Sequence, residues 1–301
     1  MIEFKPITLD DAAWARPLFE AENSPSADHN FVNVYCWQGS FISSIARIGD
    51  RAAVRIDGLG RTIFSYPLGS GALIPVIDAL REYAREIGIP FVMRGVTDVQ
   101  RETLDALFPG HFEYEEETSA FDYVYLASRL STYSGKSLHS KKNHCNRFEA
   151  ENDWRFVPLT KELIPACMEM LEGWKLQNAE RLSESIRHEY TVIDRAMDGF
   201  DALGLEGGVL YSGDRIVGFT YGDFTTPDTL DVHVEKADIS INGAYSMVCR
   251  EFVRMMMNKH PSLIYINRED DMGLDYLRQS KRSYKPEFLL KKYRARWTDE
   301  L

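Results

Sequence analysis

Apolar residues along this chain recur with the two spacings that mark helices and strands. Spacings of three and four residues predict one amphipathic helix in each half of the chain. These helices carry Leu73, Ile77, Leu80, Ala84 and Ile87 in the first half, and Ile241, Ala244, Val248, Phe252 and Met255 in the second. Each helix is followed by a proline and a compact apolar run, at residues 90–93 and 261–266, which predicts a buried strand.

The two halves repeat each other in order. Residues 4–8 (FKPIT) return as 156–160 (FVPLT), and residues 45–51 (IARIGDR) return as 209–215 (VLYSGDR), where Gly-Asp predicts a tight hairpin. The pattern predicts a strand, two helices, a three-stranded meander, a helix, a strand, a helix and a strand in each half. The final strands are expected at 121–126 and 287–293. Antiparallel hairpins followed by a helical crossover indicate an α+β fold.

A polar loop and a basic segment separate the halves. Residues 130–135 read as a loop, and residues 136–147 are rich in lysine, histidine and arginine. We therefore predict a first domain at 1–130, a basic linker at 131–152 and a second domain at 153–301 that holds the active site.

Composition narrows the class of protein. The chain has 301 residues, with 35 Lys+Arg against 46 Asp+Glu and a net charge of −11, which argues against general coating of DNA or RNA. No run approaches eighteen apolar residues and the start lacks a signal-peptide pattern, so we expect a cytoplasmic protein without a transmembrane segment. The four cysteines lie far apart and form no zinc-type spacing, so no metal is expected.

Several motifs resemble a known family. They are residues 135–144 (GKSLHSKKNH), 146–148 (NRF), 234–237 (VEKA), 267–274 (NREDDMGL) and 277–278 (LR), followed by Lys281, Ser283, Tyr284 and Pro286. The chain resembles the C-terminal catalytic domain of phosphatidylglycerol lysyltransferase and its stand-alone bacterial relatives, and more distantly the Fem-type aminoacyl-tRNA-dependent ligases. The resemblance implies tandem GNAT-like domains, each a mixed, mostly antiparallel sheet flanked by helices. It also implies transfer of an acyl or aminoacyl group.

Such a transfer needs a site for the phosphates of its donor, which is coenzyme A or an aminoacyl-tRNA. The segment Ile241, Asn242, Gly243, Ala244 and Tyr245 opens the second-half helix, where exposed N–H groups and the helix dipole favour an anion. It stands where the superfamily has its phosphate loop, although only Gly243 and Ala244 match the usual pattern. The alternative is an ordinary helix start capped by Asn242.

The transfer also needs a base for the attacking group. Glu235 ends a predicted strand, and the resemblance implies that a carboxylate there is the general base. His233 lies two residues back, on the same face of a regular strand, and is a candidate substrate ligand. The alternatives are a surface Glu235 paired with Lys236 or Arg250, and a His233 that is simply an interior residue.

Charged residues after the next strand form a further candidate. Asn267 and Arg268 follow the apolar run at 261–266, and a guanidinium at a sheet end can hold a carboxylate or phosphate. The acidic residues beside them, Asp270 and Asp271, can equally cap the following helix.

Basic residues gather in two segments of this acidic chain. The first holds Lys136, Lys141, Lys142 and Arg147, and the second holds Lys281, Arg282, Lys285, Lys291, Lys292, Arg294 and Arg296. A polyanionic donor would dock there. We assign Lys141 and Arg147 to substrate binding and, on the family motif, Lys281 and Tyr284 to the catalytic group. The alternative is a solvated surface.

No Ser-, Cys- or His-based nucleophile pattern is present, so direct attack by the acceptor is expected. The predicted function is an acyl- or aminoacyltransferase that moves a group from CoA or aminoacyl-tRNA to a small-molecule amine or hydroxyl. The alternative is a non-catalytic module that binds CoA or a lipid head group. The first half has only a weak phosphate-binding loop, at 68–71 (LGSG), and no acidic residue at 65–67. It is therefore expected to support the second half, which holds the active site.

Overall fold

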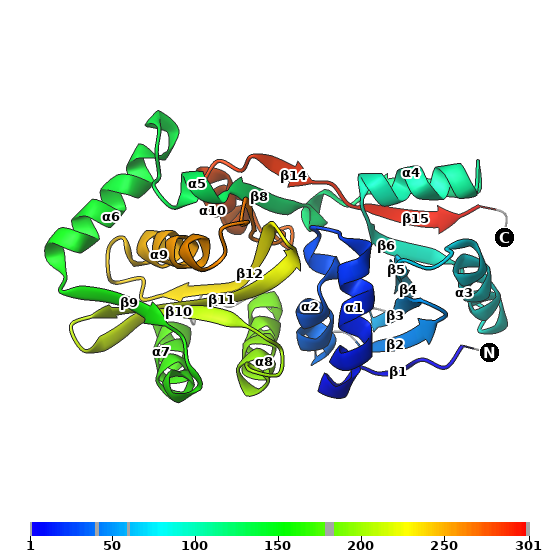
Figure 1. Cartoon of the computed structure of the whole chain (residues 1–301), viewed down its shortest axis with the longest axis horizontal. Coiled ribbons are helices and arrows are strands. Elements are labelled where there is room, and N and C mark those ends of the chain that lie inside the picture. The colour runs from blue at the N-terminus through cyan, green and yellow to red at the C-terminus, as the bar shows by residue number, and fades with distance from the viewer. Residues whose placement is uncertain (1, 40–41, 59–60, 178–183, 299–301) are drawn as a thin grey trace. The chain divides into compact units, whose positions relative to one another are not determined.

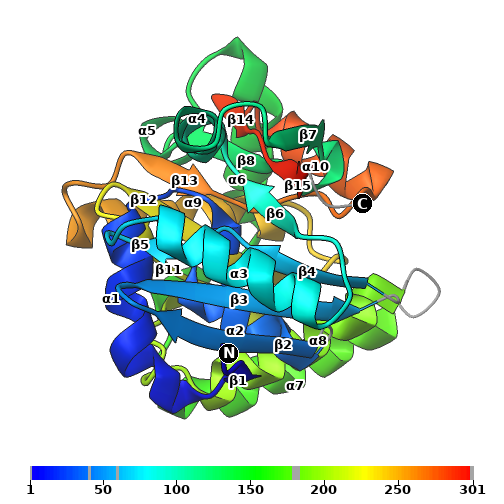
Figure 2. The same ribbon diagram turned by 90° about the vertical axis from the view of Figure 1, so that its right-hand side faces the viewer.

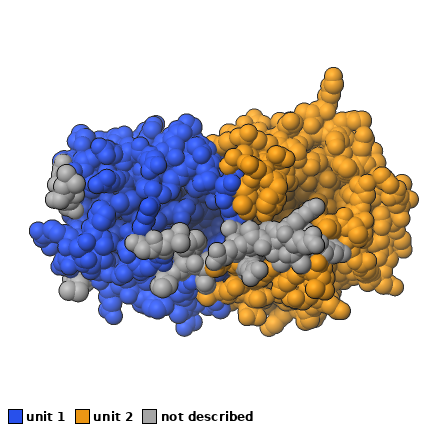
Figure 3. Space-filling view, turned by 180° about the vertical axis from the view of Figure 1, so that it is seen from behind, with its two compact units in different colours: residues 1–122, 270–273, 290–301 blue, residues 123–269, 274–289 orange. Residues whose placement is uncertain are grey.

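A computed structural model describes residues 2–39, 42–58, 61–177 and 184–298. The chain divides into two compact units. Unit 1 comprises Met1–Asp122, Asp270–Gly273 and Leu290–Leu301, and unit 2 comprises Tyr123–Glu269 and Leu274–Leu289 (Figure 3).

Unit 1 is a mixed sheet covered by helices. Its strands follow the order β1-β2-β3-β4-β6-β15-β7, with β5 paired to β3. Figure 2 looks onto α3, which lies across the strands of this sheet. The elements are β1 (Lys5–Pro6), α1 (Ala12–Glu22), α2 (Phe31–Cys36), β2 (Ile42–Ile48), β3 (Arg51–Gly58), β4 (Arg61–Ser65), β5 (Leu68–Gly69), α3 (Ile74–Glu86), β6 (Val92–Val96), α4 (Asp98–Leu107), β7 (Phe112–Glu116) and β15 (Tyr293–Trp297).

Unit 2 has the same architecture. Its strands follow the order β14-β8-β13-β12-β11-β10-β9, with α9 on one face and α7 and α8 on the other (Figure 1). Its elements are β8 (Asp122–Leu126), α5 (Ala127–Leu130), α6 (His139–Glu151), β9 (Trp154–Pro158), α7 (Ile164–Gln177), α8 (Glu184–Asp198), β10 (Glu206–Ser212), β11 (Arg215–Thr226), β12 (Thr229–Ala237), α9 (Ala244–Lys259), β13 (Tyr265–Asn267), α10 (Asp275–Ser283) and β14 (Phe288–Leu290).

The predicted repeat and the α+β class are confirmed. Both Gly-Asp hairpins form, with Ile48 opposite Arg51 and Ser212 opposite Arg215. The apolar stripe of α9 packs in the core of unit 2 through Val248, Phe252 and Met256. The spacing rule succeeds here because the buried stripe of a helix and the period of the helix coincide.

The last strand of each half of the chain belongs to the sheet formed mainly by the other half. β8, which ends the first half, pairs with β13, and β15, which ends the second half, pairs with β6 and β7. The units therefore differ from the predicted domains, whose boundaries assumed that each half keeps its own last strand. The strand expected at 287–293 is also two strands, β14 and β15, and the sequence pattern missed β7.

Strands β12 and β13 separate shortly after they meet. They pair in parallel only from Thr229 opposite Tyr265 to Asp231 opposite Asn267, while β12 continues to Ala237. In the strand pairing that the structure describes, the rest of β12 is held by β11 alone. This unpaired edge of β12 carries Glu235.

Candidate functional site

A buried ion pair lies at the unpaired edge of β12. The Arg268 guanidinium donates through one terminal nitrogen, Nη2, to Glu235 Oε2, and the two side chains are only 12% and 9% exposed. The Cys249 thiol of α9 also forms a hydrogen bond with Glu235. The other terminal nitrogen of Arg268, Nη1, is buried and has no hydrogen-bond partner among the described residues. Glu235 is thus held in place by Arg268 and Cys249, and one buried N–H group of Arg268 has no acceptor among the described residues.

Two cations lie over the ring of Tyr284. The guanidinium carbon of Arg268 lies 4.4 Å from the ring centroid and the Lys141 ammonium nitrogen lies 3.8 Å from it. Cations are attracted to the face of an aromatic ring, so buried Tyr284 positions both. Burial and the nearby Arg268 charge lower the pKa of Lys141 to about 8, despite the opposing field of Glu235.

Hydrogen bonds of Lys281 hold the backbone at Arg268 and at Lys281 itself. Its ammonium donates to the Arg268 carbonyl oxygen, and the Tyr125 hydroxyl donates to the Lys281 carbonyl oxygen over 2.8 Å. The structure therefore brings Glu235, Arg268, Lys141, Lys281 and Tyr284 together, and we call these five residues the cationic cluster. It joins α6 to the end of α10, so the two basic segments of the sequence meet here.

His233 belongs to a separate group of charges. Its Nδ1 lies 2.9 Å from Glu269 Oε1 and its Nε2 lies 2.8 Å from Asp223 Oδ1. Burial favours the neutral ring, but the carboxylates of Asp231, Asp223 and Glu269 outweigh it and raise the pKa of His233 well above its usual value. The ring is an imidazolium in which both nitrogens are engaged.

The expected shared face of Glu235 and His233 is not found. A β-bulge lies at His233: Tyr221 pairs with Val234 and Gly222 with Val232, so His233 is the extra residue. A bulge adds one residue and breaks the alternation of a strand. Asn267, expected to bind substrate, is buried and uses its side-chain oxygen to accept from the Glu269 N–H over 2.7 Å.

The carboxylates around His233 also place metal-ligand atoms close together. Ligand atoms of Asp231, His233 and Glu269 lie within 4.8 Å of one another. Both ring nitrogens of His233 lie against carboxylates, so in this structure the group forms a salt-bridge network.

Hydrogen bonds within the chain engage several backbone N–H groups of the turn before α9. Asp238 Oδ1 accepts from the N–H and hydroxyl of Ser240, and the Ile241 N–H donates to the Asp238 carbonyl. A Cβ added to Gly243 (φ +87°) would lie 2.2 Å from the His144 carbonyl oxygen. The glycine thus permits close approach of α6, whereas the sequence analysis expected approach of a phosphate.

Three further predicted donor-site residues have partners of their own. The Asn242 side-chain oxygen lies 3.0 Å from His144 Nδ1, and the Tyr245 hydroxyl accepts from the Trp174 indole over 2.7 Å. The Ala244 N–H donates to the Ile241 carbonyl. The turn is therefore tied to α6 and α7.

The remaining basic candidates lie on the surface or in other pairs. Arg147 is exposed on α6 and pairs with Glu151 over 2.8 Å. Lys236 pairs with Glu189 over 2.8 Å, and Arg250 pairs with Glu251 over 2.7 Å. Neither therefore takes the place of Arg268 beside Glu235. Sequence reasoning missed Cys249 and Tyr125, which resemble core residues in their segments.

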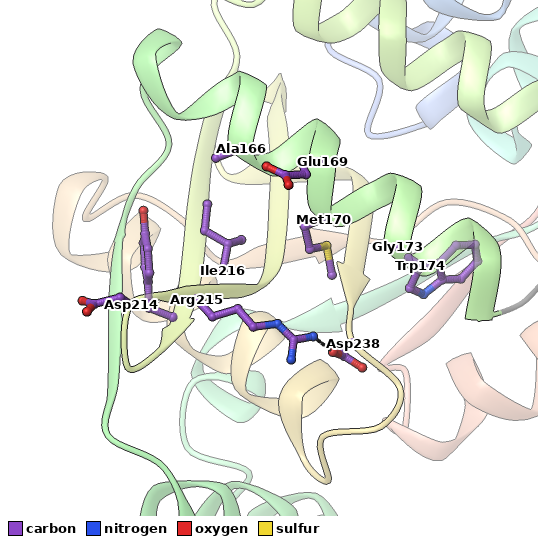
Figure 4. A pocket seen from close by; sticks show the side chains of 10 residues that line it. Ala166, Glu169, Met170, Gly173, Trp174, Asp214, Arg215, Ile216 and Asp238 are labelled. Carbon is purple, nitrogen blue, oxygen red and sulfur yellow. Dashed lines mark hydrogen bonds and ion pairs between the residues drawn. The ribbon is translucent and has the colours of Figure 1, made fainter.

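A pocket of about 510 Å³ lies elsewhere in unit 2. Figure 4 shows α7 on one side and the β10–β11 hairpin on the other, with Met170, Ile216 and Trp174 among the lining residues and Arg215 paired to Asp238. On the same helix, Cys167 and Leu171 are fully buried.

Comparison with known proteins gives the family. The family described as phosphatidylglycerol lysyltransferase, C-terminal, matches residues 20–296. An uncharacterized protein of Mycoplasmoides gallisepticum, MYCGA3080, is 26% identical over 201 residues, which are 66% of this chain and 62% of that protein. The chain thus matches less than two thirds of the length of that relative. Among the described residues, no helix has the length and hydropathy needed to cross a bilayer.

Solved structures extend the comparison. A conserved protein of unknown function from Bacteroides thetaiotaomicron is 35% identical, with a TM-score of 0.93 over 99% of this chain and 100% of that one. L-PGS from Bacillus licheniformis shares the fold at 14% identity, with a TM-score of 0.67 over 99% and 94% of the two chains. FemX shares it at 10% identity, with a TM-score of 0.62 over 97% and 96%. This chain belongs to the phosphatidylglycerol lysyltransferase C-terminal family.

Proposed function

We propose that this chain is an acyl- or aminoacyltransferase and that its chemistry takes place at the cationic cluster of unit 2. The observation that carries the proposal is the buried pair of Glu235 and Arg268 on the unpaired edge of β12, with Lys141 held close by on the Tyr284 ring. Membership of a lysyltransferase family supports the same reaction class.

The cluster contains the parts that acyl transfer requires. Glu235 accepts a proton from the attacking amine or hydroxyl as a bond forms to the donor carbonyl carbon. Lys141 and the free nitrogen of Arg268 stabilise the negative charge that develops on the carbonyl oxygen. The bond from that carbon to the leaving oxygen or sulfur then breaks, and the leaving group takes up the proton that Glu235 holds.

The structure favours a tRNA donor over coenzyme A. Ser240, Ile241 and Ala244 already use their backbone N–H groups within the turn before α9, and α6 packs against Gly243. A pyrophosphate would have to displace these contacts. Exposed cations on α6 and beside α10, namely Lys136, Lys142, Arg282 and Lys285, suit a longer polyanion.

The test is a transfer assay with the whole chain. Transfer RNA charged with labelled amino acids is incubated with the protein and with either phosphatidylglycerol vesicles or a panel of small amines and alcohols, and labelled acyl-CoA is tested in parallel. We expect label to move from tRNA to an acceptor. Glu235→Gln should reduce the rate by about a hundredfold, since it cannot accept the proton.

Glu206→Gln is the matched control, because Glu206 is an ion-paired carboxylate of the same unit at the far end of α9, bonded to Lys259 over 2.7 Å. It should transfer at the normal rate. If neither donor supports transfer although the folded protein binds them, the chain is a non-catalytic binding module and the proposal is wrong.

A further inference from the structure

Two carboxylates face each other inside the sheet of unit 2. Asp223 of β11 and Asp231 of β12 are directly opposite partners in the antiparallel ladder, so their side chains project from the same face of the sheet. The Asp231 side chain is buried and that of Asp223 is 13% exposed. Because like charges in opposite positions destabilise a sheet, this pair favours a cation beside it.

His233 brings a ring nitrogen to the same place. It is the extra residue of the β-bulge in β12, and a bulge re-aims a side chain. Its Nδ1 lies 2.9 Å from Glu269 Oε1 and 3.8 Å from Asp231 Oδ2. One ligand atom from each of these three residues lies within 4.8 Å of the other two. Atoms that share an ion at about 2.0–2.2 Å can be up to about 4.4 Å apart, so shifts of a few tenths of an ångström would allow all three to bind one ion.

The other ring nitrogen has the kind of partner that metal-binding histidines use. Nε2 of His233 lies 2.8 Å from Asp223 Oδ1. A histidine that binds a metal through one nitrogen commonly donates its other N–H to a carboxylate, which fixes the orientation of the ring. The backbone of Glu269 is held as well, because its N–H donates to the Asn267 side-chain oxygen over 2.7 Å and its carbonyl oxygen accepts from the Tyr123 N–H over 3.1 Å.

We infer that His233 Nδ1 and the carboxylates of Asp231 and Glu269 bind one divalent transition-metal ion. The ion takes the place of the Nδ1 proton, which passes to solvent, and the Nε2–H group stays bonded to Asp223. Since one of the three ligands is an imidazole nitrogen, the site favours Zn²⁺ over Mg²⁺, which prefers oxygen ligands. The Glu269 side chain is 20% exposed, so the site reaches solvent on that side.

The site lies where β12 and β13 separate. Its ligands come from β12 and from the residues that follow β13, and Asp223 adds a contact from β11, so an ion here would tie three segments of unit 2 together. No sequence spacing signals such a site, because Glu269 is 36 positions from His233. The site shares no residue with the cationic cluster, and the inference therefore does not depend on the proposed function.

The first experiment titrates Zn²⁺, and separately Mg²⁺, into the whole chain after treatment with a chelator, and measures the heat of binding and thermal unfolding. We expect saturable binding of one Zn²⁺ per chain with a higher Tm, and weaker binding of Mg²⁺. Glu269→Gln removes one ligand and should weaken Zn²⁺ binding by about a hundredfold or more. The matched control is His260→Gln, because His260 of the same unit also lies against a carboxylate, Glu206, over 2.8 Å. This control should bind Zn²⁺ normally.

The second experiment locates the ion without any variant, so it applies even if Glu269→Gln does not fold. Crystals of the whole chain grown with Zn²⁺ are measured at the zinc absorption edge. We expect an anomalous peak about 2.0–2.2 Å from His233 Nδ1 and from one carboxylate oxygen each of Asp231 and Glu269.

Four results would overturn the inference. They are absence of saturable Zn²⁺ binding by the folded wild-type protein, tighter binding of Mg²⁺ than of Zn²⁺, normal Zn²⁺ binding by folded Glu269→Gln, and an anomalous peak elsewhere without one at His233. None of these measurements uses transfer activity. A chain that transfers no group but binds Zn²⁺ as expected would therefore refute the enzymatic role and support the metal site.

Discussion

The two units share a fold but differ in how one buried group of cations in each is paired. In unit 1, Lys292 is 1% exposed and its ammonium lies 2.7 Å from Asp122 and 3.0 Å from Asp28. Arg294 similarly pairs with Glu117 over 2.5 Å. In the cationic cluster of unit 2, by contrast, Arg268 pairs with Glu235, while Lys141 lies over the Tyr284 ring and makes no ion pair among the described residues.

The difference lies in the number of carboxylates beside each cation. Beside β15 of unit 1, Lys292 has two carboxylate partners, so its charge holds the fold together. In the cationic cluster, Arg268 pairs with Glu235, and its other terminal nitrogen, Nη1, is buried without a hydrogen-bond partner among the described residues. Four experiments test this difference.

The largest effect is expected for Lys292→Met. Removing this cation leaves the fully buried Asp122 without its ion pair, which should cost about 3–5 kcal/mol of unfolding free energy. The double variant Lys292→Met with Asp122→Asn should recover part of this loss. Calorimetric unfolding of both variants checks the prediction, and a Lys292→Met protein as stable as wild type would show that unit 1 does not depend on this pair.

Acid should weaken unit 1 through His29. Burial, partly opposed by Asp28 and reinforced by Lys292, lowers the pKa of His29 to about 4 from 6.5. The unfolded state therefore takes up this proton first, and the stability contributed by neutral His29 is lost as the pH falls from 6.5 through 4, by about 3 kcal/mol in total. Denaturant titrations should show a shallower acid dependence for His29→Gln than for wild type. Equal pH dependence of the two proteins would contradict the assignment.

Two glycines test whether the turn before α9 is a packing feature. Gly243→Ala places a Cβ against the His144 carbonyl oxygen at a positive φ, so we expect a loss of about 2–3 kcal/mol. Gly88 in unit 1 also has a positive φ (+72°) but nothing within 4 Å of an added Cβ, so Gly88→Ala should cost only about 1 kcal/mol. Chemical denaturation measures the unfolding free energy of each variant. Equal losses would mean that α6 shifts to accommodate the added Cβ at little cost in stability.

The smallest effect is expected at Lys141. Its pKa of about 8 lies below the usual 10.5, so the unfolded state binds more protons between these values and stability rises as the pH increases from 8 to 10.5. Lys141→Met should therefore be more stable than wild type at pH 7, by about 1 kcal/mol after solvent screening, with the difference closing by pH 10. Thermal scans across this range provide the check. If Lys141→Met is less stable than wild type at pH 7, the charge of Lys141 is already neutralised by a partner in the folded protein.

The sequence predicted what short-range patterns determine. Helix spacing, the Gly-Asp hairpins and the duplicated order of elements follow from residues close together in the chain, and they are confirmed. The resemblance selected Glu235, Arg268, Lys281 and Tyr284, which the structure brings together. That agreement concerns position, and the roles of these residues remain predictions.

Long-range pairings could not be read from the sequence. Lys236 and Arg250 are the partners that the sequence offers for Glu235, but in the structure Arg268, which follows β13 and is 33 positions away, forms the pair. Lys292 and Asp122 are 170 positions apart. Gly243 looked like a phosphate contact because a glycine leaves room, yet only the folded position of His144 shows what fills that room.

The exchange of last strands has a consequence for synthesis of the protein on the ribosome. β15 is the last strand of its sheet in chain order, yet it stands between β6 and β7. Until β15 has been synthesised, β6 and β7 lack the partner between them and expose unpaired backbone N–H and C=O groups. The nascent first half thus depends on β15 to finish its sheet, and a chain interrupted before Tyr293 should be prone to aggregate.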